Sequence, residues 1–184
     1  MKTWSRRLGT LGKVVRFDYP YQLEGRGRPD RPEVLIAAHT EALHKARKRH
    51  RGPVVLAGKS MGSRIGCHVS LTEPVDALVC LGYPLRSPAG RLRDAVLLEL
   101  TTPVFFAQGS RDPLCPLQAL DAVRPRMKAR SQRYVVEGGN HSLEVGVRAL
   151  ASRGQTQHDL DAQILFALET FLRQSLQPKQ ERRR

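Results

Sequence analysis

Residues 54–63 read VVLAGKSMGS, four apolar residues that run directly into a Gly-x-Ser-x-Gly pattern centred on Ser60. A short apolar run followed by small residues predicts a strand that turns sharply into a helix. In such a turn the serine hydroxyl stands above the end of the sheet, and Gly58 and Gly62 are expected to let neighbouring backbone pass close by. Ser60 is therefore the leading candidate for a nucleophile.

A phosphate-binding loop is the competing interpretation, because Gly58-Lys59-Ser60 also matches the end of that motif. The motif needs a glycine five positions before Gly58, and Pro53 stands there. The apolar residues that lead up to Gly58 also leave no flexible loop. The sequence therefore argues against an ATPase.

Apolar runs and helical patterns alternate along the chain. Besides the run before Ser60, strands are predicted at Val14–Tyr19, Asp76–Leu81, Pro103–Ala107 and Arg133–Val136. Helical spacing is found over residues 1–11, 30–46, 61–71, 92–100, 117–127 and 160–171, with Asp30 and Glu33 as the expected N-terminal capping pair of the second helix. Short strands that are apolar on both faces, separated by helices, predict an α/β fold with a mostly parallel sheet and helices on both faces.

Two polar residues follow predicted strands, as the partners of a nucleophilic serine should. Asp112 comes after the 103–107 strand, and His141 comes after the 133–136 strand. Their order after Ser60 is the order that the α/β-hydrolase fold uses, with histidine as the base and the acid holding its tautomer. The backbone N–H of Met61 is the expected oxyanion donor. Alternatively, Asp112 caps a turn before Pro113 and His141 caps a helix.

Other chemically active side chains have simpler interpretations. Asp94 is the one rival acid, although its helical context favours a salt bridge. Cys115, close to Asp112, is a candidate lining residue, whereas the remaining cysteines read as small core residues, at Cys67 and Cys80. The other histidines fall in helical patterns or a basic run, where surface or hydrogen-bonded roles are expected, at His39, His44, His50, His68 and His158.

Composition limits the class of protein. Of 184 residues, 40% are hydrophobic and 26% are charged, which fits a single globular domain over 1–176 and argues against disorder or a membrane span. The net charge of +14 is spread along the chain, with basic runs at 47–51 and 182–184 and no interleaved aromatic motif, so a solvated basic surface is favoured over a nucleic-acid site. Residues 177–184 are expected to form a disordered tail.

The same residues indicate where the protein works and what it needs. Three cysteines without paired spacing argue for a reducing compartment and against a zinc site. The N-terminus does not have the order of a signal peptide. We therefore expect an intracellular protein, cytoplasmic or nuclear, that acts on a small ester-type molecule without a cofactor or a metal; a protein partner stays open.

The chain resembles the α/β-hydrolase-like family that includes testis-expressed protein thirty and the third regulatory subunit of the nonspecific-lethal histone acetyltransferase complex, which is related to dienelactone hydrolases. The resemblance rests on segments 17–21, 58–64, 81–85, 108–116 and 138–142. It implies an α/β-hydrolase fold with Ser60, Asp112 and His141 in the triad positions, and it implies no particular substrate. The chromatin subunit makes a non-catalytic interaction protein the alternative to an esterase or thioesterase.

Members of this family carry a strand ending in His-Gly-Ala-Gly before the segment that matches residues 1–11. We therefore expect this chain to be an N-terminally incomplete hydrolase, with a slot between the Val14–Tyr19 strand and the Val54–Ala57 strand. Such a form is expected to express poorly and to hydrolyse little, because the missing loop supplies an oxyanion donor.

Overall fold

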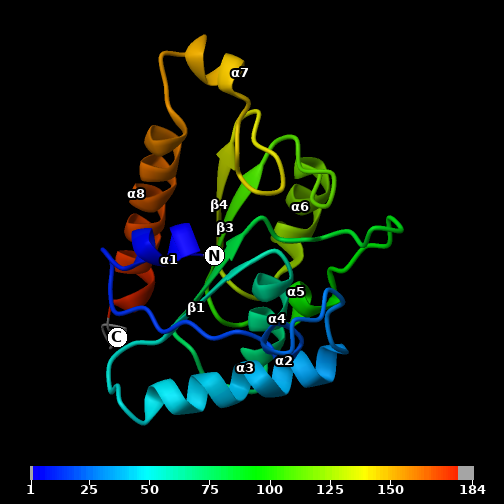
Figure 1. Cartoon of the computed structure of the whole chain (residues 1–184), viewed down its shortest axis with the longest axis vertical. Coiled ribbons are helices and arrows are strands. Elements are labelled where there is room, and N and C mark those ends of the chain that lie inside the picture. Colours follow the sequence, from blue (N-terminus) through cyan, green and yellow to red (C-terminus); the bar gives the residue numbers. More distant parts are fainter. Residues whose placement is uncertain (1, 178–184) are drawn as a thin grey trace, which may run out of the picture.

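A four-stranded parallel sheet forms the centre of the protein (Figure 1). The computed structural model describes residues 2–177. The strands are β1 (Val55–Lys59), β2 (Ala77–Leu81), β3 (Val104–Gly109) and β4 (Ser131–Val136), and they lie in the order in which they occur in the chain. This is the α/β fold with a parallel sheet that the alternation of apolar runs and helical patterns predicts.

The carboxyl ends of the four strands lie along one edge of the sheet. Lys59 is paired with Leu81, Leu81 with Ala107, and Ala107 with Tyr134. The loops that follow the strands are therefore neighbours, and whatever side chains they carry are brought together at that edge.

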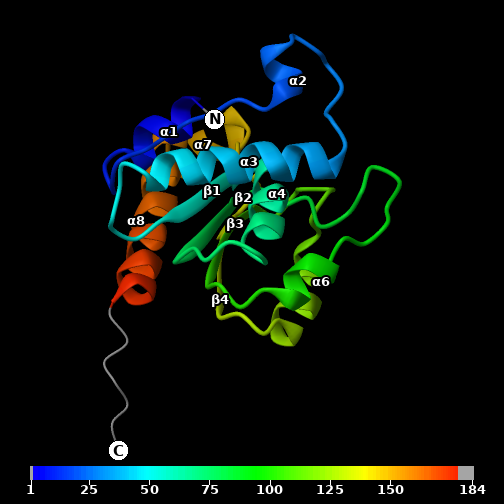
Figure 2. The same ribbon diagram turned by 90° about the horizontal axis from the view of Figure 1, so that it is seen from below.

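Helices cover both faces of the sheet. Their bounds are α1 (Lys2–Leu8), α2 (Pro20–Leu23), α3 (Pro32–Arg47), α4 (Met61–Val69), α5 (Ala95–Glu99), α6 (Leu117–Val123), the 3-10 turn η1 (Arg124–Arg126), α7 (Val147–Ala151) and α8 (Gln157–Leu176). Figure 2 shows α4 and α6 on one side of the sheet and α8 on the other. One hydrophobic core holds side chains of α3, α4, α5 and α6, and a second core on the opposite face holds side chains of α1, α7 and α8. Because consecutive parallel strands are joined by right-handed crossovers, a sheet in chain order carries its crossover helices on one face.

The face of the sheet without crossover helices is covered by α1, which precedes β1 in the chain, and by α8, which follows β4. Phe171 of α8 packs against Phe105 of β3, with their ring centroids 5.6 Å apart. Trp4 of α1 is buried in the same core, and Arg7 forms an ion pair with Asp161 of α8. The second core therefore depends on α1 and α8 docking together.

The predicted strand Val14–Tyr19 is wrong. These residues form no helix or strand, and Val15 is 59% exposed. Instead of joining a sheet, Phe17 and Tyr19 pack their rings against His39 of α3. β1 is consequently an edge strand, so the expected slot between two flanking strands does not occur in the described chain.

The predicted cap of α3 is also wrong. The residue before the helix is Arg31, which makes no side-chain capping bond. The Asp30 carboxylate instead accepts hydrogen bonds from the backbone N–H of Tyr21 (3.0 Å) and from the Arg26 guanidinium (2.6 Å). Asp30 therefore fixes the loop before α3 rather than the first turn of the helix.

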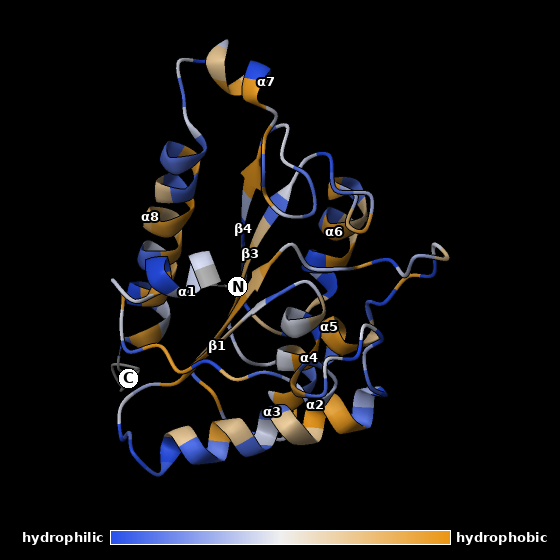
Figure 3. Cartoon of the chain, viewed as in Figure 1, coloured by the Kyte–Doolittle hydropathy of each residue, from blue (hydrophilic) through white to orange (hydrophobic). Residues whose placement is uncertain are grey.

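Hydropathy follows the layers of the fold (Figure 3). β3 is fully buried and apolar from Val104 to Ala107, whereas the C-terminal end of α3, where the 47–51 basic run begins, is hydrophilic. No helix in the part of the chain that the structure describes is long and apolar enough to cross a membrane. The predicted tail lies almost entirely outside the described residues.

Candidate active site

The structure brings Ser60, Asp112 and His141 together at the carboxyl edge of the sheet. The Ser60 hydroxyl and His141 Nε2 are 2.8 Å apart, and His141 Nδ1 is 2.7 Å from an Asp112 carboxylate oxygen. The Asp112 side chain is fully buried, whereas a quarter of the His141 side chain is exposed. The buried carboxyl group of Asp112 therefore lies beneath the imidazole, whereas Ser60 and His141 are both partly exposed.

Ser60 adopts a strained backbone conformation between β1 and α4. Its φ of 52° and ψ of −123° lie in a region that non-glycine residues rarely occupy. Its N–H donates to the Leu81 carbonyl, and its own carbonyl accepts from the Ser63 hydroxyl at 2.6 Å. These bonds hold the sharp turn that the Gly-x-Ser-x-Gly pattern predicts.

The two glycines of the pattern have different environments. A Cβ on Gly58 would lie 2.3 Å from the Gly62 carbonyl carbon and from the Ser63 nitrogen, so only glycine lets α4 begin this close to β1. A Cβ on Gly62 would meet nothing within 4 Å. The close approach expected at both glycines therefore occurs at Gly58 alone.

Asp112 is held by donors other than histidine. The Gln108 amide nitrogen donates to the same Asp112 oxygen at 2.5 Å, and the Leu114 N–H donates to the other oxygen at 2.8 Å. The Gln108 amide oxygen accepts from the buried N–H of Tyr83 at 3.1 Å. Because Gln108 is completely buried in β3, it connects the acid rigidly to the loop after β2.

Two glycines missed by sequence reasoning allow the histidine loop to cross the sheet edge. A Cβ on Gly82 would lie 2.4 Å from the His141 carbonyl oxygen, and one on Gly109 would lie 2.3 Å from the Asn140 carbonyl oxygen. Gly82 also has a φ of 63°. The available signal was that Gly82 directly follows an apolar strand and that Gly109 ends one.

The neighbours of the serine in sequence also face the site. Met61 is the first residue of α4, where a backbone N–H has no partner within the helix. The Lys59 ammonium donates to the Ser142 hydroxyl at 3.0 Å, which connects the serine turn to the histidine loop.

The rival candidates lie elsewhere or are buried. Asp94 pairs with Arg126 at 3.6 Å, as a salt bridge rather than an acid of the site. Cys115 is buried, and burial raises its thiol pKa to about 12, so it lies beneath the site instead of lining an open surface. The Cys67 and Cys80 sulfurs are 3.9 Å apart in the core, as small apolar residues would be.

His39 is the buried histidine outside the site. The Tyr19 hydroxyl and His39 Nδ1 are 3.2 Å apart, and burial lowers the pKa of His39 to about 4. His39 is therefore neutral in the folded protein at neutral pH. It has the hydrogen-bonded structural role that its helical position predicts.

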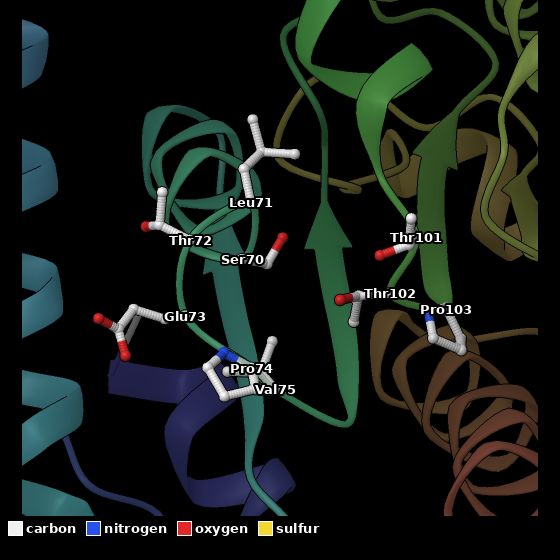
Figure 4. Close-up of a pocket in the computed structure, with 9 residues that line it drawn as sticks. All are labelled: Ser70, Leu71, Thr72, Glu73, Pro74, Val75, Thr101, Thr102 and Pro103. Atoms are coloured by element: carbon white, nitrogen blue, oxygen red, sulfur yellow. The ribbon is translucent and has the colours of Figure 1, made fainter.

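A shallow hollow lies at the opposite edge of the sheet (Figure 4). It is lined by residues 70–75 before β2 and residues 101–103 before β3. These segments precede the strands, whereas Ser60, Asp112 and His141 follow them. The hollow therefore does not belong to the serine site.

Comparison with solved structures finds the same fold. An alpha-beta serine hydrolase homologue from Coxiella burnetii is 19% identical, with a TM-score of 0.67, and the alignment covers 94% of this chain and 74% of that one. Est1E from Butyrivibrio proteoclasticus, solved with ferulic acid bound, is 16% identical, with a TM-score of 0.65 and coverage of 93% and 80%. The esterase domain of a Rhodothermus marinus protein is 16% identical, with a TM-score of 0.67 and coverage of 95% and 80%.

A comparison with protein families also finds a match. The sequence model of the alpha/beta hydrolase domain family matches residues 1–172, which is nearly the whole described chain. The chain therefore belongs to the alpha/beta hydrolase domain family.

Proposed function

We propose that the protein is a serine hydrolase that cleaves an ester or thioester by acyl transfer. The observation that carries this proposal is the unbroken hydrogen-bonded path from the Ser60 hydroxyl through His141 to Asp112, with heavy-atom distances of 2.8 and 2.7 Å. Both distances lie in the range that proton transfer between a nucleophile and its base requires.

In this mechanism His141 Nε2 takes the proton of Ser60 as the serine oxygen attacks the substrate carbonyl. Asp112 accepts the Nδ1–H hydrogen bond, which fixes the tautomer and stabilises the imidazolium. His141 then protonates the leaving alcohol or thiol, and an acyl-serine remains. Water, deprotonated by His141, attacks the acyl carbon and releases the acid, so that Ser60 regains its proton.

The tetrahedral intermediates carry negative charge on the former carbonyl oxygen. The free N–H of Met61 at the start of α4 is the donor that we assign to this oxygen. Its position directly after the serine is the usual one for a donor in a strand-turn-helix nucleophile.

A catalytic role explains the strain at Ser60 better than an interaction role does. A scaffold protein gains nothing from holding a serine at a φ of 52°. The resemblance to testis-expressed protein thirty and its relatives is compatible with either role. The triad geometry therefore favours the esterase or thioesterase hypothesis.

Labelling with a fluorophosphonate probe tests the proposal directly. We expect the adduct on Ser60, and no adduct in Ser60→Ala. Ser152→Ala removes an exposed serine of a distant loop and should label like the wild type. Asp112→Asn should lower 4-nitrophenyl ester turnover by about 100-fold or more, because the imidazole loses its tautomer. A folded protein that leaves Ser60 unlabelled would contradict the proposal.

A further inference from the structure

Half-buried positive charges divide into two groups in this protein. Among residues 3–177, four half-buried arginines each pair with a carboxylate, namely Arg7, Arg47, Arg124 and Arg133. Three half-buried cations pair with no carboxylate of the residues that the structure describes, namely Lys59, Arg64 and Arg93. Partial burial of a charge costs free energy unless a partner of opposite charge compensates for it. No carboxylate of the described residues compensates for this cost at Lys59, Arg64 and Arg93.

All three unpaired cations lie at the carboxyl edge of the sheet. Lys59 ends β1, Arg64 lies in the second turn of α4, and Arg93 lies between β2 and α5. The Lys59 ammonium is held by Ser142, whereas the guanidinium groups of Arg64 and Arg93 have no hydrogen bond to any described residue. Of these three cations, Arg64 and Arg93 are therefore the two whose side-chain N–H groups donate to no described residue.

The backbone directs Arg64 towards the serine end of α4. The Arg64 N–H donates to the Ser60 carbonyl at 3.3 Å, so the two residues are one helical turn apart on the same face. Side chains on a helix lean towards its N-terminus. Arg64 therefore lies near the end of α4 that carries Ser60, and its side chain is expected to lean towards that end.

The loop after β2 returns Arg93 to the same region. Arg86 and Leu92 form an antiparallel bridge, and the Arg93 N–H donates to the Leu85 carbonyl at 2.8 Å. The loop begins after Leu81, which is paired with Lys59 of β1, and the Arg86 N–H donates to the Leu114 carbonyl at 2.7 Å in the loop after β3. Burial lowers the pKa of Arg93, and the positive charge of Arg64 lowers it further, which is consistent with neighbouring guanidinium groups.

We infer that Arg64 and Arg93 bind a negatively charged group of the substrate, so that the enzyme acts on esters or thioesters bearing a carboxylate or phosphate. This inference rests on the proposed function for the reaction, but the anion site itself does not require turnover. Two guanidinium groups with free donors match the oxygens of either anion. Without an anion the two charges repel each other and reduce stability.

Matched substrates test the charge preference. Mono-4-nitrophenyl glutarate and 4-nitrophenyl valerate have acyl chains of equal length and differ in the terminal carboxylate. We expect kcat/KM to favour the glutarate by about 10-fold, and this ratio to fall by about the same factor in Arg64→Met and in Arg93→Met. Arg91→Met removes an exposed charge from the same loop and should change the ratio by less than about 2-fold.

Thermal unfolding in inorganic phosphate provides a measurement that needs no catalysis. We expect phosphate to raise the melting temperature of the wild type and of Arg91→Met more than that of Arg64→Met. Without phosphate, Arg64→Met should melt at or above the wild-type temperature, because the repulsion between the two guanidinium charges is removed. If Arg64→Met melts below the wild type, its melting temperature is compared with that of Arg64→Lys, which keeps the charge.

The two proposals fail separately. Labelling of Ser60 and hydrolysis of both esters at equal kcat/KM, with equal phosphate effects in all variants, would overturn the anion site and leave the hydrolase proposal intact. No labelling of Ser60, with stabilisation by phosphate that depends on Arg64, would support the anion site and overturn the hydrolase proposal.

Discussion

Replacing Gly58 by alanine should destabilise the protein, whereas replacing Gly62 by alanine should not. The new methyl group at position 58 would lie 2.3 Å from the Gly62 carbonyl carbon and from the Ser63 nitrogen. Carbon atoms in contact are normally about 3.5–4.0 Å apart, so the overlap exceeds about 1 Å. Both contacted atoms belong to the backbone of α4, which cannot rotate away as a side chain could.

Relief of this overlap requires α4 to move away from β1, where both elements are packed in the first core. Overpacking typically costs about 1–3 kcal/mol, and we expect about 3 kcal/mol here because backbone meets the new atom. For a domain of this length that corresponds to a melting temperature about 6–12 °C lower. Alanine at Gly62 should instead stabilise the helix by about 0.5–1 kcal/mol.

Urea unfolding and thermal melting of the two variants, followed by circular dichroism, measure this difference. The comparison is matched, because both variants add one methyl group to the same five-residue motif. Equal stabilities would refute the reasoning, since they would mean that β1 and α4 do not approach as closely as described.

Two further predictions concern buried polar groups. The pKa of His39 is about 4 when folded and about 6.5 when unfolded, so stability that is fully present above pH 6.5 falls by about 3 kcal/mol as the pH drops to 4. Urea unfolding at pH 7, 5.5 and 4.5 should show a smaller loss for His39→Gln, and an unchanged loss would contradict this. Gln108→Leu removes a donor from Asp112 and should lower ester turnover by about 10-fold or more, with a stability loss of about 1–3 kcal/mol. Wild-type turnover and stability in that variant would show that the amide does not position the acid.

The central sheet and the clustering of Ser60, Asp112 and His141 at its edge could be predicted from local sequence. Strands buried on both faces must be apolar throughout, as Asp76–Leu81 nearly is, and this pattern survives in any tertiary context. The positions of Asp112 and His141 followed because parallel strands end at one edge. Their hydrogen bonds agree with that placement, while their catalytic roles stay predictions.

Local sequence could not predict the environment of residues whose contacts lie far away in the chain. The β-branched and aromatic residues of Val14–Tyr19 favour a half-buried surface, which α3 provides through His39 instead of a strand. Gln108 lies inside an apolar run, and only the fold shows that its two partners are Asp112 and Tyr83. Likewise, sequence alone does not distinguish the unpaired arginines at the site from the many that find a carboxylate.

The order of the strands has a consequence for synthesis on the ribosome. Each strand can pair with the one before it as soon as it emerges, and each crossover helix then covers the same face. The opposite face has no such helix and exposes Val79 and Phe105 until α8 leaves the exit tunnel. A nascent chain that ends near residue 150 therefore already has the carboxyl edge of the sheet with Ser60, Asp112 and His141, but one face of its sheet is an uncovered apolar surface. Such a surface makes the nascent chain a target for chaperones and for aggregation.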